Sequence, residues 1–593
     1  MCFVVVRGIA EASKLIETIT RVPRYAVEGV AGRFLVYSST EGGTYSTYAL
    51  DLATHIKKLI ATEVHMAVRA HESSTKVVYL KDVSKGFELS RVFARDIETG
   101  NELVVSKDVE PQRIAGLAFD GVRVAWSGAT RALAAIYLAD IVRGTTEKVT
   151  ETKGREFVTD VSKRYIVGYG HLAGNPMSSE ILIIDVARGT QEIYTPKEGS
   201  SNVAPKLFGS RMLFASDFED GDRMRLYVLD LETRELRKPE LKYGDMDQFS
   251  PIEFVDLGWT RDGKVWAIGK KRGNSRLFLD GKDLGPETGF VSSAVFHERK
   301  AYVSFSTLKT PPKILSIDTE SKKSEVIVDN ELPPEIAERL GEVKYVEVIS
   351  FDGVKVPTYI LESSTSPKPG FTVVYPHGGP WSEVANSWSP IVVSLAVLGY
   401  HVVAPNFRGS TGYGEKFRRL DIGDPGGADM EDVAAARKWA VESGLSKEGE
   451  VSIVGYSYGG YTTLMQLTTK PKLWKCGVAG APVADWEKMY ELADRYFKTF
   501  QEVLFAGKRD IFRERSPITY VENIQAPICI VQPQNDSRTP IQPVLDFVSK
   551  LISFGKSFEL HVLPDIGHAV SLNNEALAKF LLYAAMFLSR CYS

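Results

Sequence analysis

The chain has 593 residues, enough for about four domains of average size, and carries a formal net charge of −3. Its composition, 44% hydrophobic and 25% charged without a basic excess, is typical of a globular protein and argues against nucleic-acid binding. The longest apolar stretches, near residues 391–397 and 580–588, are shorter than the roughly 20 residues that span a bilayer.

The N-terminal residues predict a cytoplasmic protein without a signal peptide. Met1 to Arg7 contain no basic segment before their short apolar run, and no convincing cleavage site follows. The four cysteines, at positions 2, 476, 529 and 591, show no CxxC or other pairing pattern, as expected of reduced thiols.

A short amphipathic helix is predicted at the start of the chain. Ala12, Leu15, Ile16 and Ile19 follow the i, i+3, i+4, i+7 spacing of one helix face. We expect residues 1–23 to form a helical extension that packs on a neighbouring domain. A helix that caps the following repeat domain would show the same pattern.

A self-similar unit of short strands fills residues 24–335. Each unit contains a short apolar strand that ends in Asp. A second apolar strand lies upstream of it, at residues 34–37 in the first unit and at residues 301–305 in the last. Units of about 40 to 45 residues made of short strands are typical of four-stranded propeller blades. The strands end in Asp at intervals of 38 to 50 residues, with a mean of 44.5, at Asp51, Asp96, Asp140, Asp185, Asp230, Asp280 and Asp318.

Seven such units predict a seven-bladed β-propeller that starts near Arg24 and ends near residue 335. Leu332-Pro333-Pro334 breaks the pattern at that point. Any all-β domain rich in hairpins would also produce apolar strands that end in Asp, but it does not require this regular spacing.

From about Gly341 the pattern changes to apolar runs separated by helical stretches, which is typical of a largely parallel sheet covered by helices. Residues 336–593 are therefore predicted to form one α/β domain, with its chemistry beyond the carboxyl ends of the strands. The expected buried strands are residues 371–375, 400–404, 451–454, 476–479, 528–531 and 558–563.

A G-x-S-x-G motif centred on Ser457 lies between a predicted strand and a helix-compatible stretch. In this context the motif forms a sharp turn that exposes the serine Oγ as a nucleophile. A serine hydroxyl needs a base within hydrogen-bond reach, and the base needs a carboxylate to orient it. His568, after the last strand, is the expected base, and Asp536, after residues 528–531, is the expected acid. The order Ser457, Asp536, His568 is that of α/β-hydrolases; Asp565 is an alternative acid, only three residues from His568.

An oxyanion formed at Ser457 needs hydrogen-bond donors. One is the backbone N–H of Tyr458, and a second is expected in the loop 377–380, whose glycines allow close approach to a substrate. His377 in this loop is interpreted as a residue that orders the loop, because no partner lies at metal-ligand spacing. His401 and His561 lie inside apolar strand patterns and are interpreted as core residues.

These motifs resemble the prolyl oligopeptidase family of serine peptidases, and within it the acylaminoacyl peptidases of archaeal type. The resemblance covers nearly the whole chain and implies a β-propeller followed by an α/β-hydrolase domain. It rests on residues 377–380, 406–414, 455–460, 535–538 and 567–568. It implies Ser457 as nucleophile, His568 as base and Asp536 as its orienting acid, with the N–H groups of Tyr458 and Gly379 as oxyanion donors.

The resemblance also implies roles in substrate binding. Arg538 is expected to hold a substrate carbonyl through its rigid donor fork, although a structural pair with a nearby carboxylate is an alternative. Phe497 and Phe500 resemble the lining of the pocket for the residue before the scissile bond; two aromatic residues in a helix are also typical of a simple core.

We therefore predict a serine exopeptidase that releases an N-acylated amino acid from the blocked N-terminus of short peptides through an acyl-enzyme. The propeller would exclude folded proteins, and esterase side activity is expected. The expected partners are short acylated peptides, without nucleic acid, membrane, metal or cofactor, and a homo-oligomer such as a dimer is compatible with the sequence.

Three alternatives share the same chemistry: a prolyl oligopeptidase, a dipeptidyl aminopeptidase and a carboxylesterase. Dipeptidyl aminopeptidases hold a free N-terminus with paired glutamates, and the chain contains no Glu-Glu dipeptide. A propeller used as a binding scaffold, with an inactive hydrolase domain, is the alternative outside the enzymes.

Overall fold

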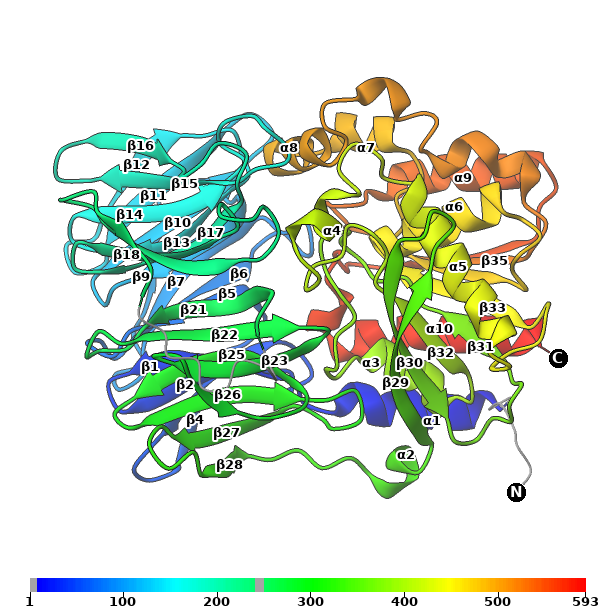
Figure 1. Ribbon diagram of the computed structural model, residues 1–593, viewed down its shortest axis with the longest axis horizontal. Helices are drawn as coiled ribbons and strands as arrows, with labels where there is room; N and C mark the ends of the chain where they lie inside the picture. The colour runs from blue at the N-terminus through cyan, green and yellow to red at the C-terminus, as the bar shows by residue number, and fades with distance from the viewer. Residues whose placement is uncertain (1–7, 240–249, 593) are drawn as a thin grey trace.

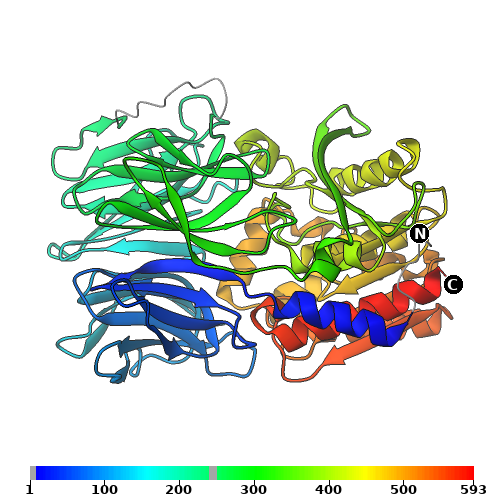
Figure 2. The ribbon, with the colours of Figure 1, turned by 90° about the horizontal axis from the view of Figure 1, so that it is seen from below.

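The computed structural model describes residues 8–239 and 250–592, which form a β-propeller and an α/β domain side by side (Figure 1, Figure 2). Residues 1–7, which carry Cys2 and the region inspected for a signal peptide, lie outside the described residues. Among the described helices, none combines the length and the apolar character of a membrane span. The described cysteines, Cys476, Cys529 and Cys591, are free thiols.

The described part of the N-terminal domain contains seven four-stranded antiparallel sheets, which confirms the predicted seven-bladed β-propeller. Each blade is built from four consecutive strands. The first four blades are β1 to β4 (Tyr25–Ala31, Phe34–Ser39, Ser46–Asp51, Lys57–Ala61), β5 to β8 (Val64–Ala70, Lys76–Asp82, Ser90–Asp96, Glu102–Val104), β9 to β12 (Arg113–Phe119, Arg123–Ala129, Ala134–Asp140, Thr145–Glu151) and β13 to β16 (Glu156–Val161, Tyr165–Gly170, Glu180–Asp185, Thr190–Tyr194). The last three are β17 to β20 (Asn202–Phe208, Arg211–Ser216, Arg225–Asp230, Leu236–Arg237), β21 to β24 (Glu253–Trp259, Val265–Lys271, Asn274–Leu279, Lys282–Gly285) and β25 to β28 (Phe290–His297, Lys300–Ser306, Lys313–Asp318, Ser324–Val328).

The periodic aspartates cap the turn that follows the third strand of a blade. Asp51 ends β3, and its Oδ1 accepts hydrogen bonds from the N–H groups of Ala53 (2.9 Å) and Thr54 (3.1 Å). Side chains that accept from backbone N–H groups two or three residues ahead stabilise tight turns. Equivalent pairs of bonds are accepted by Asp96, Asp140, Asp230 and Asp318. The repeat of the sequence is thus largely the repeat of this turn, whereas Asp280 instead accepts a hydrogen bond from the N–H of Val265 (3.0 Å).

The propeller closes by packing of its first blade against its last. Tyr25 and Val27 of β1 share a hydrophobic cluster with Tyr302 of β26 and Ile314 of β27. The N–H of Val27 also donates a hydrogen bond to the Oγ of Ser304 (3.0 Å). Side-chain packing and this bond therefore join two blades that are each complete in themselves.

The α/β domain is built on an eight-stranded sheet in the order β29-β30-β32-β31-β33-β34-β35-β36. All six predicted strands are present, and their neighbouring pairs are parallel: β31 (Thr372–Val374), β32 (His401–Pro405), β33 (Val451–Tyr456), β34 (Gly477–Gly480), β35 (Ile528–Pro533) and β36 (Phe558–Leu563). The sequence prediction missed the antiparallel strands β29 (Leu340–Ile349) and β30 (Lys355–Ser363). β29 carries several charged residues and is mostly half-buried, so it has no continuous apolar run.

Helices cover both faces of this sheet. Adjacent residues of β31 belong to two different hydrophobic clusters, one on each face of the sheet. Val373 shares its cluster with residues of α3 (Pro390–Val397) and α10 (Asn574–Cys591). Val374 shares the other cluster with residues of α5 (Ala428–Glu442), α6 (Tyr458–Thr469) and α9 (Ile541–Ser553). This alternation follows from the period of two along a strand. The helices are α2 (Pro334–Ala337), α3 (Pro390–Val397), α4 (Glu415–Arg419), α5 (Ala428–Glu442), α6 (Tyr458–Thr469), α7 (Trp486–Leu492), α8 (Arg495–Leu504), α9 (Ile541–Ser553) and α10 (Asn574–Cys591), with 3-10 helices at Arg509–Ile511, Pro517–Asn523 and Val570–Leu572.

The predicted N-terminal helix is α1 (Ile9–Arg21), and it lies along α10 of the α/β domain (Figure 2). Ile16 and Ile19 are buried in the same cluster as Phe580 and Leu588 of α10. The helix therefore packs on the neighbouring domain and does not cap the propeller.

Candidate active site

Ser457 lies at a strained turn between β33 and α6. Its backbone has φ 59° and ψ −121°, a left-handed conformation that side chains other than glycine rarely adopt. The flanking glycines permit this turn: a Cβ on Gly455 would lie 2.1 Å from the Gly459 oxygen, and one on Gly459 would lie 2.1 Å from the Pro376 oxygen. The G-x-S-x-G spacing is thus required by close backbone packing.

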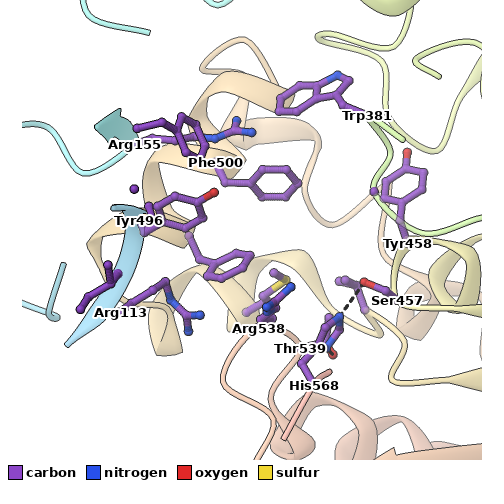
Figure 3. Close-up of a pocket in the computed structure, with 18 of the residues that line it drawn as sticks. Arg113, Arg155, Trp381, Ser457, Tyr458, Tyr496, Phe500, Arg538, Thr539 and His568 are labelled. Carbon is purple, nitrogen blue, oxygen red and sulfur yellow. Dashed lines mark hydrogen bonds between the residues drawn. The ribbon is translucent and has the colours of Figure 1, made fainter. Parts of the chain in front are cut away.

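Ser457, His568 and Asp536 come together at the carboxyl ends of β33, β36 and β35. The Nε2 of His568 lies 2.9 Å from the Oγ of Ser457 (Figure 3), and its Nδ1 lies 2.7 Å from the Oδ2 of Asp536. The alternative acid, Asp565, is exposed. This geometry lets the imidazole accept the serine proton while the carboxylate fixes its tautomer.

The loop after β35 holds the Asp536 carboxylate in place. Its Oδ1 accepts hydrogen bonds from the N–H groups of Arg538 (2.9 Å) and Thr539 (2.8 Å), and its Oδ2 accepts one from the Thr539 hydroxyl (2.8 Å). These three hydrogen bonds fix the orientation of the carboxylate. Asp536 is therefore suited to orient His568 and to stabilise an imidazolium.

The loop 377–380 lies against the serine. A Cβ on Gly378 would be 3.9 Å from the Ser457 Oγ, and Gly379 lines the same cavity as Ser457. Tyr458 is the first residue of α6, where the backbone N–H has no partner within the helix. The two N–H groups expected to stabilise an oxyanion, those of Tyr458 and Gly379, thus belong to segments beside the serine.

His377 orders this loop. Its Nδ1 lies 2.7 Å from the Gly378 oxygen, its Nε2 lies 2.8 Å from the Ser410 Oγ, and its ring stacks on Phe407 at 4.5 Å. Burial lowers the pKa of His377 to about 4, so the imidazole is neutral near pH 7. These contacts match the loop-ordering interpretation.

A cavity of about 490 Å³ opens beside Ser457, between the two domains (Figure 3). Phe497 and Phe500, on α8, line it as the sequence suggested, and the propeller contributes Arg113, Arg155 and Phe157. Aromatic side chains from both domains therefore line the cavity. Further aromatic side chains in the lining are Trp381, Trp486 and Tyr496.

Ion pairs join the domains at the edge of this cavity. Glu88, from the propeller, pairs with Arg538 (2.7 Å) and with Arg113, and Arg113 also pairs with Asp494 of the α/β domain (2.5 Å). Burial alone would raise the pKa of Glu88, but the guanidinium groups outweigh it and hold the pKa well below its usual range. Arg538 thus has the carboxylate partner considered as the alternative, and it lines the cavity as well.

Sequence reasoning did not find Glu88, Arg113, Arg155 or Trp381. Trp381 directly follows the loop 377–380, and this position was the available signal. Glu88, Arg113 and Arg155 belong to no sequence motif. They reach the cavity only because the two domains pack against each other, and a local pattern does not record this packing.

One group of side chains outside the cavity has the types that bind a metal ion. Ligand atoms of Cys529, Glu559 and His561 lie within 4.8 Å of one another. Glu559 is paired with His561 (3.2 Å) and with Arg590.

Models of known protein families match parts of both domains. Residues 386–593 match the model of the prolyl oligopeptidase family, and residues 35–315 match that of the acylamino-acid-releasing enzyme-like N-terminal domain. Dipeptidyl aminopeptidase BIII of Pseudoxanthomonas mexicana is 34% identical over 231 residues, 37% of this chain and 33% of that protein. Acylamino-acid-releasing enzyme 2 of rice is 26% identical over 251 residues, 40% of this chain and 32% of that protein. The chain thus matches about a third of the length of these curated relatives.

Solved structures share the whole architecture. A puromycin-hydrolyzing peptidase of Mycobacterium tuberculosis superposes with a TM-score of 0.79 at 18% identity, over 96% of this chain and 94% of that chain. An acylaminoacyl peptidase of Pyrococcus horikoshii superposes with a TM-score of 0.69 at 18% identity, over 95% of both chains. At this identity the likeness concerns the fold.

Proposed function

Because this chain belongs to the prolyl oligopeptidase family of serine peptidases, we propose that it releases N-acylated amino acids from the blocked N-termini of short peptides. The proposal assigns catalysis to Ser457, His568 and Asp536, without a cofactor. The proposal is more specific than serine hydrolase activity, because it names one class of substrate.

The proposed reaction runs through an acyl-enzyme. The Ser457 Oγ attacks the peptide carbonyl while His568 takes its proton, and the N–H groups of Tyr458 and Gly379 stabilise the oxyanion. His568 then gives the proton to the leaving amine. A water molecule, activated by the same imidazole, releases the acylated amino acid. The same steps would hydrolyse an activated ester, which supports the expected esterase side activity.

The charge of the cavity wall is the observation that carries this proposal. Among the described residues that line the cavity, three are Arg and none is Asp or Glu. A free α-amino group is a cation and needs a carboxylate partner, whereas an acylated nitrogen is neutral. The nearby carboxylate of Glu88 is already neutralised by Arg113 and Arg538. This wall favours a blocked N-terminus over the free one that a dipeptidyl aminopeptidase binds.

The position of the propeller supports a limit on substrate size. Arg113, Arg155 and Phe157 of the propeller form part of the wall of the cavity that Ser457 lines, so the propeller bounds this cavity on one side. Figure 1 shows the propeller beside the α/β domain. A short peptide fits such an enclosed site, and a folded protein does not.

Replacing Ser457 with Ala tests the proposal. We expect kcat for N-acetyl-leucine p-nitroanilide to fall by at least about 10⁴-fold, because the other groups cannot replace the nucleophile. Fluorophosphonate labelling should also disappear. Ser443→Ala, at an exposed position, is the control and should keep both activities.

Two results would contradict the proposal. Retained labelling of the Ser457→Ala variant would show that another residue is the nucleophile. Faster hydrolysis of the free leucine anilide than of its acetylated form by the unaltered protein would show that it is an aminopeptidase.

A further inference from the structure

Arg155 brings a buried positive charge to the cavity. It precedes β13 of the propeller, and its Cζ lies 4.6 Å from the ring centre of Trp381 and 5.1 Å from that of Phe500. Figure 3 shows its guanidinium directed into the cavity, on the side away from Ser457. Both distances lie within the range of cation–π contacts, which is about 6 Å.

Two of the three guanidinium nitrogens of Arg155 lack acceptors in the described structure. Its Nε and Nη1 are buried and donate no hydrogen bond to a described residue, and no described carboxylate forms an ion pair with it. The adjacent Glu156 instead accepts from the N–H groups of Lys153 (3.0 Å) and Gly154 (2.9 Å). Burial lowers the pKa of Arg155, and Tyr496 offsets only part of this effect. A buried donor without an acceptor is costly, so an anion placed here would be stabilised.

Neighbouring arginines are in a different situation. Arg113 pairs with Glu88 and Asp494, and Arg538 pairs with Glu88. Arg418, whose Cζ lies 5.9 Å from the Trp381 ring centre, is paired with Glu415 at 2.7 Å. Among the described arginines around the cavity, Arg155 is therefore the one whose charge is not balanced by a carboxylate.

We propose that Arg155 is a specificity-determining residue that binds a carboxylate of the substrate. This inference rests on the proposed function, because it assigns a subsite of the same cavity. The guanidinium presents a planar fork that suits a carboxylate, and the rings of Trp381 and Phe500 would contact the methylene groups that carry it. In a short acylated peptide the carboxylate belongs either to an acidic side chain before the scissile bond or to the C-terminus of the leaving residue.

Two matched substrate pairs distinguish these sources. N-acetyl-glutamate and N-acetyl-glutamine p-nitroanilides differ in the charge of the side chain, and N-acetyl-leucyl-glycine and its amide differ in the terminal carboxylate. For the pair that uses Arg155, the ratio of kcat/KM for the charged over the neutral member should fall by about tenfold or more in Arg155→Gln.

Controls separate specificity from stability. Arg143→Gln, at an exposed position of the propeller, should leave every ratio unchanged. Arg155→Lys retains the charge without the fork and should lose less of the ratio than Arg155→Gln; it serves as the test variant if Arg155→Gln does not fold. Unchanged ratios for both substrate pairs in a folded Arg155 variant would overturn the inference and leave Arg155 a purely structural contact between the domains.

A binding readout keeps this inference separate from the proposed function. The binding assay is a competition with fluorophosphonate for Ser457. It compares N-acetyl-glutamate with N-acetyl-glutamine, and N-acetyl-leucyl-glycine with its amide. The charged compound of a pair is expected to protect Ser457 from labelling better than the neutral one, and this difference should be lost in Arg155→Gln. Such a result supports the carboxylate site even if no acyl anilide is hydrolysed. Equal protection by charged and neutral members in the unaltered protein, together with normal turnover of N-acetyl-leucine anilide, refutes the inference alone.

Discussion

The ion pairs at Glu88 predict how strongly the two domains are joined at the active site. Glu88 is 2% exposed and pairs with both Arg113 and Arg538, which lie on different domains. Glu88→Gln removes a carboxylate that balances two buried guanidinium groups. Removing one partner of a buried ion pair costs about 3 to 5 kcal/mol, because the remaining charge is left uncompensated. Since Arg113 keeps its contact with Asp494 at 2.5 Å, we expect the lower end of this range, about 3 kcal/mol.

Equilibrium urea unfolding at pH 7, followed by circular dichroism, measures this loss. The loss should persist at high salt, because buried pairs are screened less than exposed ones. Glu98→Gln, an exposed position in the same blade, is the matched control and should change the unfolding free energy by less than about 0.5 kcal/mol.

A double-mutant cycle identifies the cause. If an uncompensated charge on Arg538 makes the variant unstable, adding Arg538→Met should restore part of the stability of Glu88→Gln. The reasoning is refuted if Glu88→Gln is as stable as the unaltered chain, or if the double variant loses the sum of the two single losses.

Two further predictions concern stability elsewhere in the α/β domain. Burial raises the pKa of Asp429, whose Oδ2 accepts a hydrogen bond from the Tyr458 hydroxyl (2.8 Å), to about 7. A raised pKa stabilises the fold fully below the unfolded value near 4, and this contribution is lost as the pH rises through 7. Between pH 4 and pH 8.5, the free energy of unfolding of Asp429→Asn should therefore rise by up to about 4 kcal/mol relative to that of the unaltered chain, as measured by urea unfolding. The control Asp510→Asn, at an exposed position, should show no such rise. A difference that stays constant with pH for Asp429→Asn would contradict this sign. Ile16→Ala, at 1% exposure on α1, should cost about 2 to 4 kcal/mol, and Ile9→Ala, 57% exposed on the same helix, should cost almost nothing in the same assay; equal losses would refute the packing of α1 on α10.

Local patterns were sufficient to predict the architecture and the three side chains that meet at Ser457. The aspartates spaced about 45 residues apart predicted the blades, because most of them cap the same turn with hydrogen bonds from backbone N–H groups two and three residues ahead, as Asp51 does. The motif around Ser457 predicted the strained turn, because Gly455 and Gly459 are required by contacts within that turn and its neighbouring loop. His568 and Asp536 were found because parallel strands bring their carboxyl ends to one edge of the sheet.

Strand β29 shows where such patterns stop. Its charged, half-buried residues produce neither a continuous apolar run nor a clean alternation, so its place at the edge of the sheet follows from its pairing with β30.

The tertiary structure alone decided the wall of the cavity. Glu88 contacts Arg538 across 450 residues of sequence, and Arg155 reaches Trp381 from another domain. No local period records such contacts, because they depend on how two rigid domains pack, and this packing is the sum of many weak contacts along the whole interface. The sequence by itself therefore determined that Ser457, His568 and Asp536 come together, and the tertiary structure decided which charges surround them. The physical reason is that turn and strand geometry depends on neighbouring residues, whereas the electrostatic environment of a site depends on every chain segment that reaches it.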